Sequence, residues 1–187
     1  MIIGVTGLIG SGKGAVATML VARSFIRFGC SDIIAEEVRT RGLEVTRAHL
    51  IMVGNEIRER EGSDALARRI IAKIQVGNNY VVEGFRNIAE VKAFRELPDF
   101  LLLGVAAGKQ RRMHWVFDRK RVGDPNTLAE FDALEQRDFL QFTPHGQQNA
   151  LCFALSDYYL SNEGTLAELR TQLFAALHQG TKAPVSL

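Results

Sequence analysis

The sequence has little cysteine, little net charge and no long hydrophobic run. Its two cysteines, Cys30 and Cys152, fit neither a zinc-ligand spacing nor a disulfide framework, and buried free thiols are usual in a reducing cytoplasm. The net charge of +2 gives no reason to expect nucleic acid or an anionic membrane as a partner. The longest apolar stretch, residues 100–107, is far shorter than a membrane span. We therefore expect a cytoplasmic protein.

Two further absences narrow the class of protein. The first ten residues carry no basic leader, so no cleaved signal peptide is expected. The four histidines show no ligand spacing, so no protein-bound zinc is expected. With 187 residues, 47% of them hydrophobic, the chain can bury one sizeable core and is too short for two comfortable domains. We expect one domain over residues 1–187, and the oligomeric state stays open.

A glycine-rich loop stands near the start of the chain. Residues 4–14 read Gly-Val-Thr-Gly-Leu-Ile-Gly-Ser-Gly-Lys-Gly, with G-x-x-x-x-G-K spacing. Glycines let backbone N–H groups approach a polyphosphate, the lysine adds a cation, and the following helix points its dipole at the same anion. A short apolar run precedes the loop and helical periodicity follows it, which favours this interpretation over a glycine-rich turn that binds nothing. The nucleotide-binding residues expected here are Gly7, Ile9, Gly10, Ser11, Gly12, Lys13, Gly14 and Ala15.

The loop lacks its usual metal-binding hydroxyl. Gly14 and Ala15 follow the lysine, where Ser or Thr normally offers oxygen to the magnesium of a bound nucleotide. We therefore expect no direct metal ligand from the protein, with Asp32 and Glu83 acting through water. The same departure leaves open a nucleotide-binding protein with little or no phosphoryl transfer.

Strand and helix patterns alternate along the chain and predict an α/β fold with a parallel sheet covered on both faces. The expected strands are 1–6, 24–28, 80–83, 100–106 and 158–161. Helices are expected from residue 15, then at 32–42 with Ser31 as its cap, 46–61, 63–74, 88–96, from 109 to a break at 123–125, 127–139, 150–155 and 165–178. Ligands of such sheets bind beyond the carboxyl ends of the strands. That rule selects Asp32, Glu83, Arg86 and the segments 109–112 and 162–165.

Three segments resemble known kinases. The opening, with Val16 and Ala17 after its Gly-Lys, and the late segment Leu155-Ser-Asp-Tyr-Tyr-Leu-Ser-Asn-Glu-Gly-Thr-Leu-Ala-Glu-Leu169 closely resemble dephospho-CoA kinases. The middle segment Val81-Val-Glu-Gly-Phe-Arg86 is similar to the Asp-Gly-Phe-Pro-Arg turn of adenylate kinases, as is the Lys-Gly pair of the loop. Over nearly its full length the chain looks like the dephospho-CoA-kinase-like and adenylate-kinase-like P-loop proteins.

The resemblance implies a nucleoside-monophosphate-kinase fold: a P-loop NTPase with a five-stranded parallel sheet, helices on both faces, an acceptor flap at about 32–75 and a small helical lid at about 110–140. It implies roles for particular residues as well. Lys13 would hold the donor's β- and γ-phosphates, Asp32 would orient the acceptor or the metal's waters, and Glu83 and Arg86 would bind the acceptor. The lid would supply Arg119, Arg121 and Arg137 to the transferring phosphoryl group, and Asn162, Gly164 and Thr165 would border the adenine.

Simpler roles remain open for these residues. Asp32 is also suited to a helix N-terminus, Glu83 and Arg86 to a surface ion pair, and the basic run around Arg119 to a solvated helix face. Taken with the resemblance, the loop favours an ATP- and Mg²⁺-dependent phosphotransferase acting on a nucleoside or deoxynucleoside monophosphate. Dephospho-CoA is the alternative acceptor, although residues 42–63 do not reproduce the pattern of its kinases. The sequence does not distinguish ATP from GTP as the donor.

Overall fold

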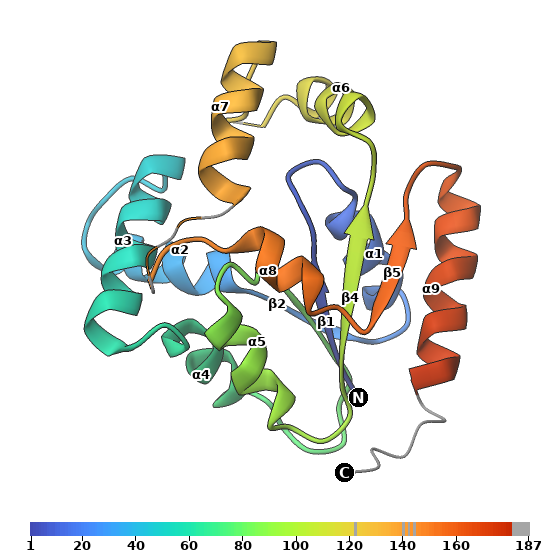
Figure 1. Cartoon of the computed structure of the whole chain (residues 1–187). Coiled ribbons are helices and arrows are strands. Elements are labelled where there is room, and N and C mark those ends of the chain that lie inside the picture. The colour runs from blue at the N-terminus through green and yellow to red at the C-terminus, as the bar shows by residue number, and fades with distance from the viewer. Residues whose placement is uncertain (122, 140, 142, 144, 181–187) are drawn as a thin grey trace.

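The computed structural model describes residues 1–121, 123–139, 141, 143 and 145–180. It contains a five-stranded parallel sheet with the strand order β2-β3-β1-β4-β5 (Figure 1). The strands are β1 (Ile2–Thr6), β2 (Ile26–Gly29), β3 (Tyr80–Glu83), β4 (Phe100–Ala106) and β5 (Tyr158–Ser161). The expected fold class is confirmed, with helices on both faces.

Alternation along the strands divides the core into two layers, because successive side chains of a strand point to opposite faces. On one face, Ile2, Val82 and Leu102 pack with the helices α2 (Cys30–Thr40), α3 (Arg47–Glu61), α4 (Ala65–Ile71), α5 (Ile88–Arg95) and α8 (Asn149–Ala154). On the other face, Ile3 and Val81 pack with α1 (Lys13–Val21) and α9 (Leu166–Gly180). The two remaining helices, α6 (Lys109–Arg119) and α7 (Leu128–Phe139), project beyond the carboxyl ends of the strands (Figure 1).

Several expected boundaries are wrong. Helix α2 begins at Cys30 and not at Asp32; Gly29 stands at its N-cap position, and no side chain caps the helix. Strand β2 begins at Ile26, since Ser24 has a positive φ of 65° in the turn after α1. Helix α6 ends at Arg119, because Lys120 adopts the left-handed conformation, so Arg121 follows the helix. Helix α4 is shorter than the expected 63–74.

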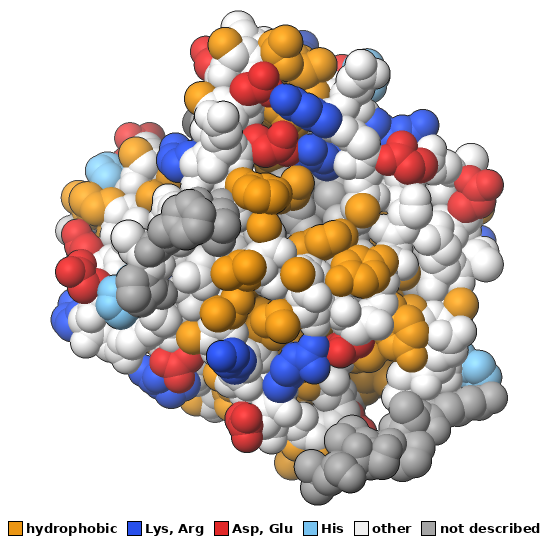
Figure 2. Space-filling model, in the orientation of Figure 1, with side chains coloured by type: hydrophobic (Ala, Val, Ile, Leu, Met, Phe, Trp, Pro, Cys, Tyr) orange, Lys and Arg blue, Asp and Glu red, His pale blue; other side chains and the backbone are white. Residues whose placement is uncertain are grey.

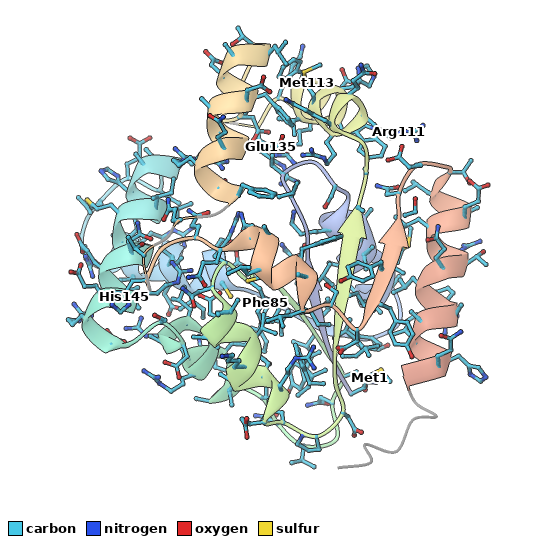
Figure 3. The ribbon with its side chains drawn as sticks, in the orientation of Figure 1. Met1, Phe85, Arg111, Met113, Glu135 and His145 are labelled. Carbon is cyan, nitrogen blue, oxygen red and sulfur yellow. The ribbon has the colours of Figure 1, made fainter. Side chains whose placement is uncertain are left out.

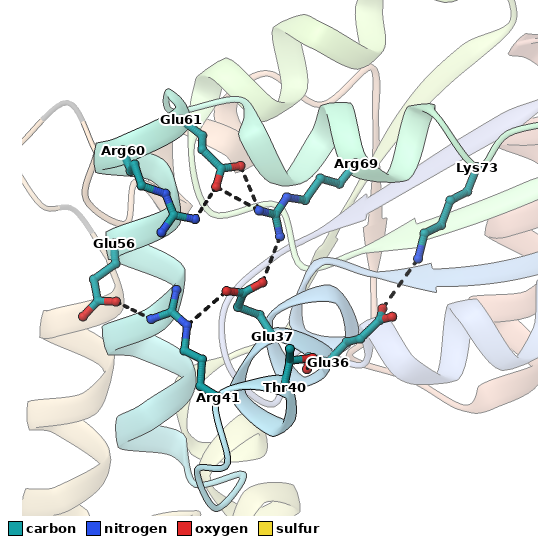
Figure 4. Close-up of polar contacts among 9 residues, drawn as sticks. All are labelled: Glu36, Glu37, Thr40, Arg41, Glu56, Arg60, Glu61, Arg69 and Lys73. Carbon is teal, nitrogen blue, oxygen red and sulfur yellow. Dashed lines mark hydrogen bonds and ion pairs between the residues drawn. The ribbon is translucent and has the colours of Figure 1, made fainter.

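An ion-pair network ties α2, α3 and α4 together (Figure 4). The guanidinium of Arg41 pairs with Glu37 at 3.0 Å and with Glu56 at 2.5 Å, and that of Arg69 pairs with Glu37 at 3.6 Å and Glu61 at 2.8 Å. Networks hold elements together better than isolated surface pairs, because each charge has more than one partner. The three helices that cover the β2 end of the sheet are therefore cross-linked by charge.

The described residues include neither a membrane-spanning helix nor a ready-made cluster of metal ligands. None of their helices is long and apolar enough to cross a membrane. No group of three or more His, Cys, Asp or Glu side chains among them is arranged to hold a metal ion. The expectation that no protein side chain ligates the metal directly stays a prediction.

Candidate active site

The glycine-rich loop joins β1 to α1 and depends on positive φ angles. Gly7, Gly10 and Gly12 have φ values of 143°, 75° and 103°. A Cβ at Gly7 would lie 2.3 Å from the carbonyl oxygen of Val105, so only glycine fits this crossing over β4. The N-terminus of α1 has no side-chain cap, which leaves N–H groups at the loop for an anion.

Lys13 folds back over this loop. Its Nζ donates hydrogen bonds to the carbonyl oxygens of Gly7 at 2.8 Å and Leu8 at 2.7 Å. The pKa of Lys13 is lowered to about 7, chiefly by desolvation and then by the positive charge of Arg86, whereas the negative charge of Glu83 acts to raise it. Arg119 and Arg112 act in the same direction as Arg86. The loop is therefore short of negative charge, which a polyphosphate would supply.

Two buried side chains support the loop from behind. Arg112, 5% exposed, donates to the carbonyl oxygens of Ile9 at 3.1 Å and Ala107 at 2.8 Å, and it forms an ion pair with Glu135 of α7. Figure 3 shows Glu135 on the side of α7 that faces the loop. Asn162, 4% exposed, donates from Nδ2 to the carbonyl oxygen of Ser11 at 3.0 Å. Both fix the loop's backbone, and the side chain of Asn162 is directed at the loop.

Gly164 and Thr165 lie beside the start of α6. Arg111, on the side of α6 toward α9 (Figure 3), donates to the carbonyl oxygen of Gly164 at 3.2 Å. The backbone N–H of Thr165 donates to Glu168 at 2.7 Å at the start of α9. The segment expected to border the adenine thus contacts the first turns of α6 and α9. Its role in nucleotide binding stays a prediction.

A cleft of about 420 Å³ opens beside the loop, between α2, α3, the end of β3 and the segment that leads into α7. Residues from distant parts of the sequence meet in it. The expected site residues that line it are Ile9, Gly10, Lys13, Glu83, Arg86, Arg119 and Arg121. Asp32 is exposed in the first turn of α2 and is not among the described lining residues, whereas its neighbours Cys30 and Ser31 are. Arg137 is also outside the described lining and donates to the adjacent Asp138 at 3.1 Å.

The third strand delivers Glu83 and Arg86 to the cleft. Glu83, 9% exposed, lies beside Val5 and Gly29 in the sheet and accepts from Arg27 Nε at 2.5 Å. The hydrogen bond to Glu83 also raises the pKa of Arg27. Glu83 is thus a carboxylate held at the carboxyl ends of three adjacent strands, in the same cleft as Lys13.

Buried Glu90 organises the turn that carries Arg86. Its carboxylate accepts from the backbone N–H of Arg86 at 2.8 Å and of Asn87 at 3.2 Å, and from Arg58 Nε of α3 at 2.9 Å. Glu90 has no exposed surface and Arg58 only 2%. One carboxylate therefore sets both the start of α5 and the position of Arg86 relative to α3.

Sequence reasoning missed several residues of the cleft. Arg47, in the first turn of α3, donates from Nη2 to Asp138 Oδ2 at 2.8 Å, and burial in the cleft lowers its pKa. Arg119 pairs with Asp124 through two hydrogen bonds of 2.6 Å and 2.9 Å. Arg119 was expected, but its partner Asp124 was missed. Asp124 stands within the Gly-Asp-Pro break, five residues after Arg119, and this spacing was a usable signal. Nothing local indicated the contact between Arg47 and Asp138, which are 91 residues apart.

The amide side chains Asn55 and Gln147 also line the cleft. Asn55 Oδ1 and Gln147 Oε1 are buried without a hydrogen-bond partner among the described residues. Buried polar atoms nearly always have a partner, so unpaired acceptors in a cleft mark places where a ligand can donate. The apolar side chains that accompany them are Ile34, Val45, Leu50 and Ile51.

Solved structures of several other proteins share this fold. TT1252 from Thermus thermophilus is 22% identical with a TM-score of 0.61, covering 96% of this chain and 97% of that one. A shikimate kinase from Acinetobacter baumannii in complex with shikimate is 13% identical with a TM-score of 0.60, covering 98% and 95%. The dephospho-CoA kinase from Campylobacter jejuni is 14% identical with a TM-score of 0.51, covering 97% and 98%. With the phosphate loop, these likenesses define a P-loop kinase-like fold.

The family follows from sequence relatives. The chain is 33% identical over 179 residues to a UPF0200 protein of Methanothrix thermoacetophila, covering 95% of this chain and 97% of that protein. It is 33% identical over 174 residues to a UPF0200 protein of Hyperthermus butylicus, covering 92% and 90%. No family model matches the chain. The protein belongs to the UPF0200 family. Its likeness to the solved dephospho-CoA kinase is one of fold.

Proposed function

We propose that this protein is an ATP-dependent phosphotransferase that uses Mg²⁺ to move a γ-phosphate to a small nucleotide-like acceptor, a nucleoside or deoxynucleoside monophosphate. One observation carries the proposal. Lys13 of the phosphate loop and Arg86 at the end of β3 share one cleft and lie close enough for Arg86 to depress the pKa of Lys13. In-line transfer requires this neighbourhood of donor-binding and acceptor-binding cations.

Each cation of the site has a place in such a transfer. The loop amides and Lys13 hold the donor's phosphates, Arg86 grips the acceptor, and Arg119 and Arg121 neutralise charge that develops on the transferring group. The side chain of Arg137 is paired with Asp138. It would reach the transferring group only after a shift of the lid. Gly164 and Thr165 border the adenine of the donor.

The residues fit a magnesium ion held through water. Glu83 is a carboxylate in the same cleft as Lys13, and Asp32 stands on the first turn of the helix that follows β2. A Cβ at Gly14 would meet nothing within 4 Å, so the space beside the loop is open. Bound magnesium would neutralise the donor's phosphates, and Glu83 would orient its waters.

The lining of the cleft favours an acceptor that carries a nucleobase over one that is a polyol. Ile34, Val45, Leu50 and Ile51 offer apolar surface to a planar ring, and the unpaired oxygens of Asn55 and Gln147 can accept from its N–H groups. A polyol would leave more hydroxyls against apolar side chains than these two amides can satisfy. Dephospho-CoA, which also carries a base and phosphates, is the alternative acceptor.

A second candidate function is nucleotide binding with little transfer. Gly14 and Ala15 remove the loop hydroxyl, and the cleft arginines Arg47 and Arg119 are already paired with carboxylates. A sensor of this kind would bind ATP without consuming it.

One screen separates these functions. The protein is incubated with ATP, with and without Mg²⁺, and with each nucleoside monophosphate, dephospho-CoA, shikimate or gluconate, and products are identified by mass. We expect Mg²⁺-dependent formation of a nucleoside diphosphate, with Lys13→Ala inactive and still folded by circular dichroism. Phosphorylation of dephospho-CoA alone would select the alternative acceptor. ATP binding without any product would select the second function.

A further inference from the structure

Helix α7 is attached to the rest of the molecule through carboxylates. Asp132 pairs with Lys109 at 2.7 Å, Glu135 pairs with Arg112, and Asp138 pairs with Arg47. Figure 2 shows acidic and basic side chains meeting between α6 and α7. Two carboxylates, Asp138 at the end of the helix and Asp124 just before it, differ from the others because they line the cleft.

Asp138 is a buried anion shared by three arginines. It is 4% exposed, and its Oδ2 lies 2.8 Å from Arg47 Nη2 and 3.8 Å from Arg86 Nη1. Its other oxygen accepts from Arg137 at 3.1 Å and 3.2 Å. Arg47 Nε is buried with no hydrogen-bond partner among the described residues. A single carboxylate thus leaves the arginines with uncompensated charge and an unused donor.

Asp124 stands in the same relation to Arg119. Both of its oxygens accept from the guanidinium, and its side chain is 8% exposed. The positive charge of Arg119 contributes to the lowered pKa of Lys13, so the two side chains interact electrostatically. The cations that a transferring phosphate needs are therefore held by carboxylates at the two ends of one lid segment, residues 124–138.

We propose that Asp138 is an internal stand-in for the phosphate of the acceptor, holding Arg47 and Arg86 in the ligand-free protein and giving way to a phosphate monoester when one binds. The inference rests on the proposed function for the identity of the ligand as an acceptor, but the exchange of anions can be measured without phosphoryl transfer. Asp124 does the same for Arg119 at the other end of α7.

The exchange favours a phosphate monoester on charge and geometry. A monoester near neutral pH carries more negative charge than a carboxylate and has three acceptor oxygens, which suits a pair of planar guanidinium groups with an unused Nε–H. When the phosphate takes over Arg47 and Arg86, the carboxylate of Asp138 loses two of its partners. The C-terminal turn of α7 is then released, so acceptor binding is coupled to movement of the lid.

The first test measures affinity for AMP and inorganic phosphate, in the absence of ATP, in two isosteric variants of the full chain. Asp138→Asn removes the competing anion, so both ligands should bind about tenfold more tightly than to wild type. Asp132→Asn is the matched control, because Asp132 lies on the same helix with its side chain 43% exposed and pairs with Lys109 outside the cleft. Weaker binding to Asp138→Asn would show that Asp138 orients the arginines for the ligand, and an equal gain in both variants would show a general charge effect; either result overturns the proposal.

The second test uses wild-type protein and does not depend on the variant's folding. Amide hydrogen exchange is followed with and without AMP. Displacement of Asp138 should slow exchange in the first turn of α3, where Arg47 binds the phosphate, and speed it in the last turn of α7. Equal protection of both segments would mean that Asp138 stays in place, which contradicts the proposal. Absence of ATP turnover would count against the proposed function only and would leave these binding results intact.

Discussion

Nucleotide binding should be linked to proton uptake by Lys13. The pKa of this lysine is lowered to about 7, chiefly by desolvation and then by Arg86. A polyphosphate beside Nζ favours the charged form and raises the pKa again. In the free protein at pH 8, Lys13 is therefore mainly neutral, and it must take a proton from solution when ATP binds. Below pH 6 it is already charged, and binding should take up almost no proton at this group.

The size of the effect follows from the pKa. With a pKa of about 7, about nine in ten Lys13 side chains are neutral at pH 8, so binding should take up about 0.9 proton. If the neutral amine adds nothing to binding, affinity for ATP falls about tenfold for each unit of pH above 8, or about 1.4 kcal/mol per unit. At pH 7 the loss is only about twofold.

Calorimetry measures this uptake directly, because the apparent binding enthalpy at one pH varies with the ionisation enthalpy of the buffer in proportion to the protons exchanged. The control is Lys13→Met, which keeps the length of the side chain and removes its titration, while ATP's own titration is common to both proteins. Equal proton uptake by wild type and Lys13→Met at pH 8 would refute the assignment of a depressed pKa to Lys13.

Four further predictions concern single residues. In the ligand-free protein, Lys13→Met should be more thermostable than wild type below pH 7, because folding of the wild type buries a charged lysine there. This gain should shrink as the pH rises from 7 to the lysine's ordinary pKa of 10.5, and differential calorimetry of both proteins checks it. Gly14→Ser should tighten ATP binding only when Mg²⁺ is present, since a Cβ there meets nothing within 4 Å; magnesium titrations that are the same for both proteins would contradict it. Arg86→Ala should weaken the acceptor by about 2 to 3 kcal/mol with little effect on ATP, whereas Arg119→Ala should lower turnover more than affinity; two-substrate kinetics that show equal losses for ATP and acceptor in Arg86→Ala would disprove the division. Glu90→Gln, which leaves Arg58 buried without its counter-charge, should lower the free energy of unfolding by about 3 to 5 kcal/mol in urea titrations, and a loss below about 1 kcal/mol would show that the pair is dispensable.

The sheet could be predicted because its signals are local. Short and continuous apolar runs marked the strands, and the glycine spacing marked the phosphate loop. The start of α2 was misplaced because Ser31 looked like a cap, whereas the helix begins at Cys30 with no side-chain cap. That start places Cys30 and Ile34 toward the core and Asp32 toward solvent, with Asp32 outside the described lining of the cleft.

The partners of the arginines could not be predicted, because they come from segments that meet only in the folded chain. Arg47 and Asp138 are 91 residues apart, and Arg58 and Glu90 are 32 apart. A charged residue on an amphipathic helix carries no local mark of a distant partner, and most such residues are solvated. Sequence reasoning therefore found Arg86 and Arg119 through their place after a strand or beside a break, and it missed the acids that hold them.

The charges of the described cleft limit what can occupy it. Seven cationic side chains line it, against three carboxylates, Glu83, Asp124 and Asp138. The cations are Lys13, Arg27, Arg47, Arg58, Arg86, Arg119 and Arg121. Desolvation is the main cause of the lowered pKa of Lys13, and repulsion between like charges in the cleft adds to it. A neutral ligand would leave that repulsion in place, whereas a polyphosphate beside Lys13 and a monoester beside Arg47 and Arg86 would each relieve it. The same charge excess that destabilises the empty cleft thus favours two phosphorylated ligands bound at once, which is the arrangement that phosphoryl transfer requires.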